Sequence, residues 1–177
     1  MAERVRSFAP VASADARVLI LGSMPGVASL NAGQYYAHPQ NRFWPIMGRL
    51  LGFDPANTSY AQRTAYLTAA GVALWDVLQS CERSGSLDSA IRRETQRVND
   101  FSAFFAAHPK MRAVYFNGAH AAQVFARVVL PTLADRPDLQ FVRLPSTSPA
   151  HASRSFEDKL AEWRQILATD RRPVLRD

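Results

Sequence analysis

The amino-acid sequence predicts a three-layer α/β/α sandwich with a central, mainly parallel four-stranded sheet. Short apolar runs rich in β-branched residues alternate with stretches of helical periodicity. The runs are widely spaced, and parallel neighbouring strands need such crossover segments between them. With 177 residues, 47% of them hydrophobic, the chain is long enough to bury one core but too short to favour two domains.

The first expected strand, residues 17–21, is the apolar run RVLIL, which ends at Gly22. The other expected strands cover residues 72–77, 113–116 and 140–144, and the expected helices cover residues 42–51, 60–70, 100–107, 119–130 and 155–168. In the last helix, apolar residues recur at spacings of three and four, as one buried face requires. Residues 80–89 and 131–138 are typical of loops. We expect a single domain over residues 1–177, with a core of about residues 15–169 and short extensions at both ends.

The net charge of +6 and the pI of 10.1 favour an anionic partner, with nucleic acid first, although scattered arginines also occur in proteins that bind no polyanion. The single cysteine, Cys81, excludes an intramolecular disulfide, a four-cysteine zinc site and a cysteine-ligated iron–sulfur cluster. The first residues show no signal peptide, and no stretch of about 20 apolar residues occurs. We therefore expect a cytoplasmic protein without a membrane-spanning segment.

Polar residues follow all four expected strands. Ligands of open parallel sheets bind outside the carboxyl ends of the strands. Four groups should therefore face one cleft: residues 22–26 (GSMPG), Asp76, Asn117 with Gly118, and residues 146–151 (STSPAH). The four histidines show no paired metal-ligand spacing with acidic partners, so we expect no metal and no organic cofactor.

Residues 34–44, QYYAHPQNRFW, are unusual for a connecting loop. Aromatic faces suit stacking on a base, an asparagine suits hydrogen bonding to a base edge, and Arg42 suits contact with phosphate. The alternative is structural: Phe43 and Trp44 would begin a buried helix with Asn41 as its N-cap. The two interpretations are compatible.

The run GSMPGVASLNAGQYYAHPQNRFW resembles the first motif of the uracil-DNA glycosylase superfamily, in particular its DNA-deoxyinosine (hypoxanthine-DNA) glycosylase branch. The resemblance extends to LWDVLQSCERSGSLDSAI in mid-chain, to FNG at residues 116–118 and to STSPA at residues 146–150. It implies an enzyme that flips a deaminated base, hypoxanthine first, out of double-stranded DNA and hydrolyses its N-glycosidic bond. The product would be an abasic site. We expect such a protein to act as a monomer.

The resemblance also implies roles for single residues. Met24 stands where other branches have an Asp or Asn that activates water, which methionine cannot do; this role would pass to Asn41. Tyr36 would stack on the flipped base, with Tyr35 as its substitute, and His38 would hold the loop or donate a proton. The base-binding candidates in the loop are Gly22, Ser23, Met24, Pro25 and Gly26. Their backbone amides would bind the leaving base, except that of Pro25, which has no N–H.

The STSPA segment resembles a motif that inserts into the duplex, and Ser146 stands where the best-known members have a histidine that stabilises the leaving base. Ala150 is a small wedge for the vacated space, and His151 is the alternative; the structural interpretation is a polar turn capped by His151. The DNA-contacting candidates are Arg42, Ser146, Thr147, Ser148, Pro149, Ala150 and His151. Asn117 and Asp76 would touch the base or order the cleft, the commoner role of such an Asn being to form a turn.

Three alternatives remain open. A uracil or mismatch-specific pyrimidine glycosylase is favoured by HPQNRFW and disfavoured by Met24 and Ser146. The second is a non-catalytic module that binds damaged DNA or free bases, which the absent acidic water activator would permit. Replacing Asn41 separates the two classes, because a catalyst should lose turnover while it keeps its affinity for DNA. A nucleoside hydrolase would ignore duplex DNA, so its substrate affinity would lack the steep salt dependence of phosphate contacts.

Overall fold

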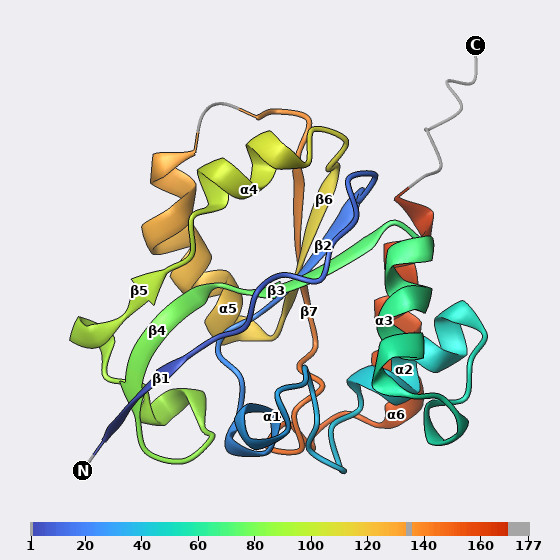
Figure 1. Ribbon diagram of the computed structural model, residues 1–177, viewed down its shortest axis with the longest axis horizontal. Coiled ribbons are helices and arrows are strands. Elements are labelled where there is room, and N and C mark those ends of the chain that lie inside the picture. Colours follow the sequence, from blue (N-terminus) through green and yellow to red (C-terminus); the bar gives the residue numbers. More distant parts are fainter. Residues whose placement is uncertain (1, 134–135, 170–177) are drawn as a thin grey trace.

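The computed structural model describes residues 2–133 and 136–169, and the expected parallel sheet lies at its centre (Figure 1). The sheet contains β2 (Val18–Gly22), β3 (Val72–Asp76), β6 (Ala113–Asn117) and β7 (Gln140–Leu144). Their order is β3-β2-β6-β7, and all neighbouring pairs are parallel. Each of the four expected strands is confirmed to within one residue at either end.

Successive side chains of β2 enter different cores, because side chains alternate between the two faces of a strand. Val18 and Ile20 pack with α2 (Phe43–Leu51), α3 (Tyr60–Ala69) and α6 (Phe156–Trp163). Leu19 and Leu21 pack with α4 (Phe101–Ala107) and α5 (Ala119–Val124) on the opposite face. Figure 1 shows the two helical layers on either side of the sheet. The predicted α/β/α sandwich is confirmed.

Two of the expected helices do not stay α-helical to their ends. The segment expected as a helix over residues 119–130 is α5, a π-helical turn Phe125–Val129 and a 3₁₀ turn Leu130–Thr132. α6 likewise continues as a 3₁₀ turn, Arg164–Ala168. The short helix α1 (Val27–Ala32) was not expected, because its six residues carry no apolar stripe. A further 3₁₀ turn, Pro55–Asn57, joins α2 to α3.

A second, antiparallel sheet contains β1 (Glu3–Arg6), β4 (Leu78–Arg83) and β5 (Arg97–Val98), in the order β1-β4-β5. The prediction of a loop over residues 80–89 is therefore wrong for residues 80–83. They belong to a strand whose partner, β1, lies more than 70 residues away in the sequence, so local composition does not reveal the pairing. Residues 3–6, which we expected to belong to a short extension outside the core, thus form a strand of the second sheet. In the other expected loop, residues 134–135 lie outside the described residues.

Between β4 and β5 the chain forms two 3₁₀ turns, Asp88–Ala90 and Arg93–Thr95. The parallel register pairs Gly22 with Asp76, and Asn117 with Leu144. The segments that follow these strands therefore leave the sheet at one edge, next to α1 (Figure 1). Within the described ranges, no helix is long and apolar enough to cross a membrane.

Candidate active site

A cavity of about 500 Å³ lies at the carboxyl edge of the parallel sheet. Four segments line it: residues 22–26 with Ala28 and Ser29, the aromatic loop with Tyr35, Tyr36, His38 and Asn41, residues 86–89, and residues 146–151. Asp76 and Asn117 complete the lining from the ends of β3 and β6. The cleft predicted from the strand ends is thus present, and residues 86–89 form a wall that we did not predict. The volume of the cavity is within the usual range of ligand sites.

Gly22 allows the Asp76 carboxyl and the Tyr36 hydroxyl to approach the start of the GSMPG loop. A Cβ atom at Gly22 would lie 2.5 Å from Asp76 Oδ1 and 3.0 Å from the Tyr36 hydroxyl oxygen. The backbone also joins the GSMPG loop to the segment after Asp76, because the amides of Val77 and Leu78 donate to the carbonyls of Gly22 and Ser23. The absence of a side chain at Gly22 therefore keeps the base of the cavity open around Asp76.

Asp76 is a buried carboxyl group that lines a cavity. The residue is 3% exposed, and Oδ2 has no hydrogen-bond partner among the described residues. Burial, followed by the nearby Asp88 carboxylate, raises the pKa of Asp76 to about 7, while the positive charge of Arg83 opposes the rise. At neutral pH the group is thus divided between a carboxylate, which only accepts hydrogen bonds, and a carboxylic acid, which also donates one.

Arg83, on β4, is hydrogen-bonded to the GSMPG loop. Its side chain is buried, and Nη2 donates to the Pro25 carbonyl oxygen at 2.5 Å. Burial lowers the pKa of the guanidinium, against the attraction of Cys81, Asp88 and Asp76. Nothing in the local sequence indicated this role, because we expected residue 83 to lie in a loop.

Tyr36 has a strained backbone next to the cavity. Its φ of 54° lies in the left-handed region, which a bulky residue rarely adopts and which costs about 1–3 kcal/mol. One face of its ring stacks on Phe43, with 4.1 Å between centroids. A base can therefore stack only on the opposite face. Burial and then the charge of Asp76 raise the pKa of the Tyr36 hydroxyl, so it is neutral at physiological pH.

Tyr35 and His38 have structural contacts in the same loop. The Tyr35 hydroxyl donates to the Ala9 carbonyl at 2.8 Å, and the Trp44 indole donates to the Tyr35 carbonyl at 2.9 Å. With these contacts and an exposed fraction of 3%, Tyr35 packs in the core. His38 Nδ1 accepts from the Gln40 amide at 3.1 Å, and the His38 carbonyl accepts from the Asn41 amide. These bonds favour a loop-holding role for His38.

Asn41 lines the cavity and also prepares the start of α2. Its Oδ1 accepts from the Phe43 amide at 2.9 Å. The expectation that Asn41 is the N-cap is wrong by one position: the N-cap is Arg42, whose backbone is already helical and whose side chain makes no capping bond. The Asn41 side chain satisfies one of the free amides at the helix start. An amide oxygen has two lone pairs, so Oδ1 can still accept a second hydrogen bond.

The STSPA segment is fastened to β6 and to the aromatic loop. Asn117 donates through Nδ2 to the Thr147 hydroxyl and accepts through Oδ1 from the Thr147 amide, both at 2.9 Å. The Arg42 amide donates to the Thr147 carbonyl at 3.0 Å. Asn117 thus orders the cleft, the second role considered for it. Gly118 has a φ of 96°, and a Cβ there would lie 3.0 Å from Ser146 Cβ, so this junction requires glycine.

The rim formed by residues 148–151 rests on a buried lysine. Lys159 is 3% exposed and its Nζ donates to the His151 carbonyl at 2.6 Å. Burial, and then the charge of Arg42, lowers the pKa of Lys159. The His151 amide donates to the Ser148 carbonyl, as the polar-turn interpretation predicts. Pro149 and Ala150 at the tip are exposed.

Residues 86–88 are bound to the GSMPG side of the cavity. The Ser23 hydroxyl donates to Asp88 Oδ1 at 2.6 Å, and the Val27 amide donates to the Ser86 hydroxyl oxygen at 2.9 Å. A Cβ atom at Gly26 would lie 3.3 Å from the Ser86 hydroxyl oxygen, so Gly26 allows the two segments to approach closely. In the part of the chain that the structure describes, no group of three or more His, Cys, Asp or Glu side chains could hold a metal ion.

The fold and the cavity define an α/β protein with a cleft of small-molecule size where its parallel strands end. The sequence model of the Uracil DNA glycosylase superfamily matches residues 9–169. The chain belongs to this superfamily.

Three relatives illustrate the similarity. A hypoxanthine DNA glycosylase from Methanosarcina acetivorans is 32% identical over 162 residues, which is 92% of this chain and 97% of the relative. Another, from Methanosarcina barkeri, is 36% identical over 118 residues, which is 67% of this chain and 73% of the relative. A solution NMR structure of a candidate uracil DNA glycosylase from M. acetivorans superimposes with a TM-score of 0.76, at 30% identity, and covers 93% of this chain and 97% of that one.

Proposed function

We propose that this protein is a DNA glycosylase that flips a deaminated base, most directly hypoxanthine, out of duplex DNA and hydrolyses its N-glycosidic bond. The observation that carries the proposal is the cavity of about 500 Å³, which the GSMPG loop, Tyr36, Asn41 and the STSPA segment line together. The two relatives from Methanosarcina, each aligned with this chain over most of its own length, are both named hypoxanthine DNA glycosylase. Their names support hypoxanthine as the base.

The chemistry requires that the enzyme stabilise positive charge on the sugar and negative charge on the leaving base. In the proposed reaction a water molecule attacks the sugar C1′, and the bond between C1′ and the base nitrogen breaks with its electron pair on the base. The departing base takes up the proton that the water loses, so the products are a C1′ hydroxyl and the free base. Asn41 Oδ1 orients that water, since Met24 cannot do so. Backbone amides of residues 22–26 and the Ser146 hydroxyl face the leaving base. The reaction leaves an abasic site, and the proposed mechanism uses no metal and no organic cofactor.

Selectivity begins with base flipping, because a poorly paired base costs less to unstack than a normal one. Hypoxanthine has O6 and N7 as acceptors and N1–H as a donor. A neutral Asp76 carboxyl has one donor and one acceptor, which can bind O6 and N1–H together. Donors of the GSMPG loop aimed at O6 would reject the amino group of adenine. We therefore assign Asp76 to the base edge and the free face of Tyr36 to stacking.

The remaining site residues act on the DNA backbone or hold the loops. The exposed Arg42 side chain contacts a phosphate, and residues 146–151 approach the duplex beside the flipped base. Tyr35, His38 and Asn117 keep the cleft in shape through the bonds described above. We further propose that the protein acts as a monomer in the cytoplasm on double-stranded DNA.

Base release from matched duplexes tests this function. Each duplex carries one deoxyinosine, deoxyuridine or deoxyxanthosine, and alkali-labile strand cleavage reports the abasic site. We expect the fastest release from deoxyinosine, a loss of release in Asn41→Ala, and unchanged release in Asn57→Ala, an asparagine outside the cavity. Faster release of uracil would assign the protein to the pyrimidine branches. Binding without release from any duplex would indicate a damage-recognition module.

A further inference from the structure

The second, antiparallel sheet has an apolar inner face that belongs to the core. Val5, Leu78, Cys81 and Val98 all pack in the core on the α4 and α5 side of the molecule. The register pairs Val5 with Cys81 and Leu78 with Val98, and paired residues of an antiparallel ladder project on the same side. The register shifts between Leu78 and Ser80, so Ser80 and its partners project from the opposite, outer face.

The outer face of this sheet presents arginines. Arg6 on β1 and Arg97 on β5 lie on the two sides of Ser80, which pairs with both of them. Ser80 is only 3% exposed, whereas both arginines are exposed. Arg4 lies two residues before Arg6 and opposite Glu82, so its side chain projects from the same face. We call Arg4, Arg6 and Arg97 the arginine face.

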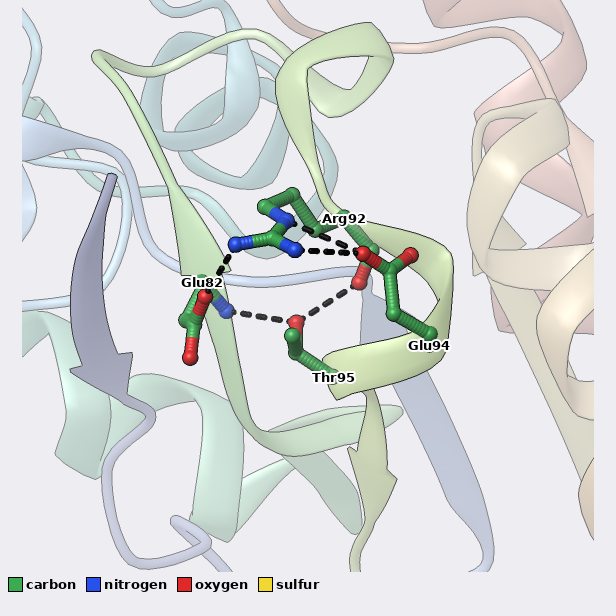
Figure 2. Close-up of polar contacts among 4 residues, drawn as sticks. All are labelled: Glu82, Arg92, Glu94 and Thr95. Carbon is green, nitrogen blue, oxygen red and sulfur yellow. Dashed lines mark hydrogen bonds and ion pairs between the residues drawn. The ribbon is translucent and has the colours of Figure 1, made fainter. Parts of the chain in front are cut away.

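The acidic side chains next to the arginine face are bound to another residue, as Figure 2 shows. The Arg92 guanidinium lies between two carboxylates, with 2.8 Å to Glu82 Oε2 and 2.9 Å to Glu94 Oε1. The Thr95 hydroxyl accepts the Glu82 amide at 2.8 Å and donates to the Arg92 carbonyl at 2.6 Å. In the part of the chain that the structure describes, no acidic side chain forms an ion pair with the arginine face.

Gln96 extends the positive charge toward the π-helical turn. Its backbone carbonyl accepts Arg97 Nη1 at 3.1 Å, and its side-chain Oε1 accepts Arg127 Nη2 at 2.8 Å. Arg127 is exposed, and within the described ranges it has no acidic partner either. Cations that gather without acidic partners repel one another, and an anionic partner relieves that repulsion.

The arginine face adjoins the cleft through β4. Arg83, the last residue of β4, donates to the Pro25 carbonyl of the GSMPG loop. Residues 86–89, which follow shortly after it, line the cavity. The second sheet therefore lies beside the cleft, where a duplex that extends beyond the lesion can reach it.

We propose that the arginine face binds phosphate groups of duplex DNA outside the cleft. A guanidinium binds phosphate through paired hydrogen bonds, and such contacts carry no base preference. Arg6 and Arg97 are two strand spacings apart, about 10 Å, so they can contact separate phosphates. The contact needs no flipped base and thus goes beyond the proposed function. It holds the protein on undamaged DNA, along which a protein bound only through phosphates can slide.

The salt dependence of affinity for undamaged DNA tests this surface. The probe is a fluorescent duplex of about 24 base pairs without a lesion, about 80 Å long at about 3.4 Å per base pair. Each phosphate contact contributes about 0.9 to the slope of log affinity against log salt concentration. We expect the double variant Arg6→Gln, Arg97→Gln to reduce this slope by about 2 and the affinity at low salt by about tenfold or more. Replacing both arginines by Lys should keep most of the slope, because lysine also binds phosphate.

The matched control is the double variant Arg112→Gln, Arg164→Gln, which removes the same charge from exposed positions outside the second sheet. It should leave the slope nearly unchanged. The proposal is overturned if the variant of Arg6 and Arg97 keeps the wild-type slope. It is also overturned if the control reduces the slope equally, since net charge alone would then explain the effect.

Arginine modification of the wild type with phenylglyoxal, mapped by mass spectrometry, needs no variant. The undamaged duplex should protect Arg6 and Arg97 but not Arg112. Equal protection of all three, or protection of none, would contradict the proposal. Because the DNA carries no lesion, both experiments are independent of base release: a protein that releases no base would refute the proposed function and leave this surface in place.

Discussion

Replacing Asp76 by Asn should stabilise the protein at neutral pH and leave its stability nearly unchanged at acid pH. The pKa of Asp76 is about 7 in the folded chain, against an ordinary value of 3.8 in an unfolded one. Between these values the unfolded chain releases a proton that the folded chain keeps. The wild type therefore loses stability as the pH rises from about 4 to about 7, and the loss levels off above pH 7. Asn cannot ionise, so the variant lacks this loss.

The expected size follows from the pKa difference. A difference of about 3 units corresponds to about 4 kcal/mol at about 1.4 kcal/mol per unit. The pKa of about 7 already includes the attraction of the carboxylate to Arg83, so this is the difference expected once the folded carboxyl is fully ionised. For a chain of this length the full gain would raise Tm by about 10 °C. At pH 4 the two proteins should differ little, since a protonated Asp and an Asn are both neutral.

Urea unfolding of wild type and Asp76→Asn at a series of pH values between 4 and 8 measures the difference directly. The other titrating groups cancel when the two proteins are compared at one pH. Asp15→Asn is a suitable control, because Asp15 is exposed and its ion pair with Lys110 lowers its pKa. Its replacement should therefore destabilise as the pH rises. A pH-independent difference between wild type and Asp76→Asn would refute the reasoning about the buried carboxyl.

Three further changes probe other parts of the site. Gly22→Ala places a methyl group 2.5 Å from Asp76 Oδ1. We expect it to destabilise the protein by about 1–3 kcal/mol, measured by unfolding, and to slow base release sharply, measured in single-turnover assays. Unaltered release would show that the close approach of Asp76 to Gly22 does not matter for the reaction. Arg83→Met removes the charge that opposes the rise in the pKa of Asp76, so the pH at which base release declines should move upward. An unchanged pH profile would show that the charge of Arg83 does not influence the protonation of Asp76 during the reaction. Lys159→Met removes the bond to the His151 carbonyl, so hydrogen exchange in residues 148–151 should accelerate and duplex affinity should fall, whereas unchanged exchange would mean that this rim needs no support.

The parallel sheet could be predicted because its information is local. The strands β2, β3 and β6 are short apolar runs buried on both faces, and each strand of the sheet is separated from the next by a segment long enough for a crossover. The edge strand β7 is mostly exposed, and it was predicted from its β-forming residues and its position before Pro145. The second sheet has no such signature. β4 alternates buried polar residues such as Ser80 and Arg83 with exposed or half-buried ones, and it pairs with β1 across more than 70 residues. Only the three-dimensional structure reveals that partner.

The cleft was predictable for a similar reason, since strand ends that share an edge must bring their following residues together. The contributions of single side chains to the cleft were less predictable from the sequence. The sequence indicated Asn41 as a capping and catalytic candidate, and its Oδ1 does bind the Phe43 amide, although Arg42 occupies the N-cap position. The strained backbone of Tyr36, the stacking of its ring on Phe43 and the buried Arg83 depend on packing between segments far apart in the chain. No local motif specifies them.

Single-turnover release of free hypoxanthine from a duplex with one deoxyinosine opposite thymine, measured by mass spectrometry, tests the central claim most directly. Wild type, Asn41→Ala and Asn57→Ala would be compared after their affinities for the same duplex have been measured. We predict that wild type and Asn57→Ala release hypoxanthine, and that Asn41→Ala binds the duplex with wild-type affinity but releases the base at least about 100-fold more slowly. Equal release by wild type and Asn41→Ala, or no hypoxanthine release by the wild type, would contradict the account.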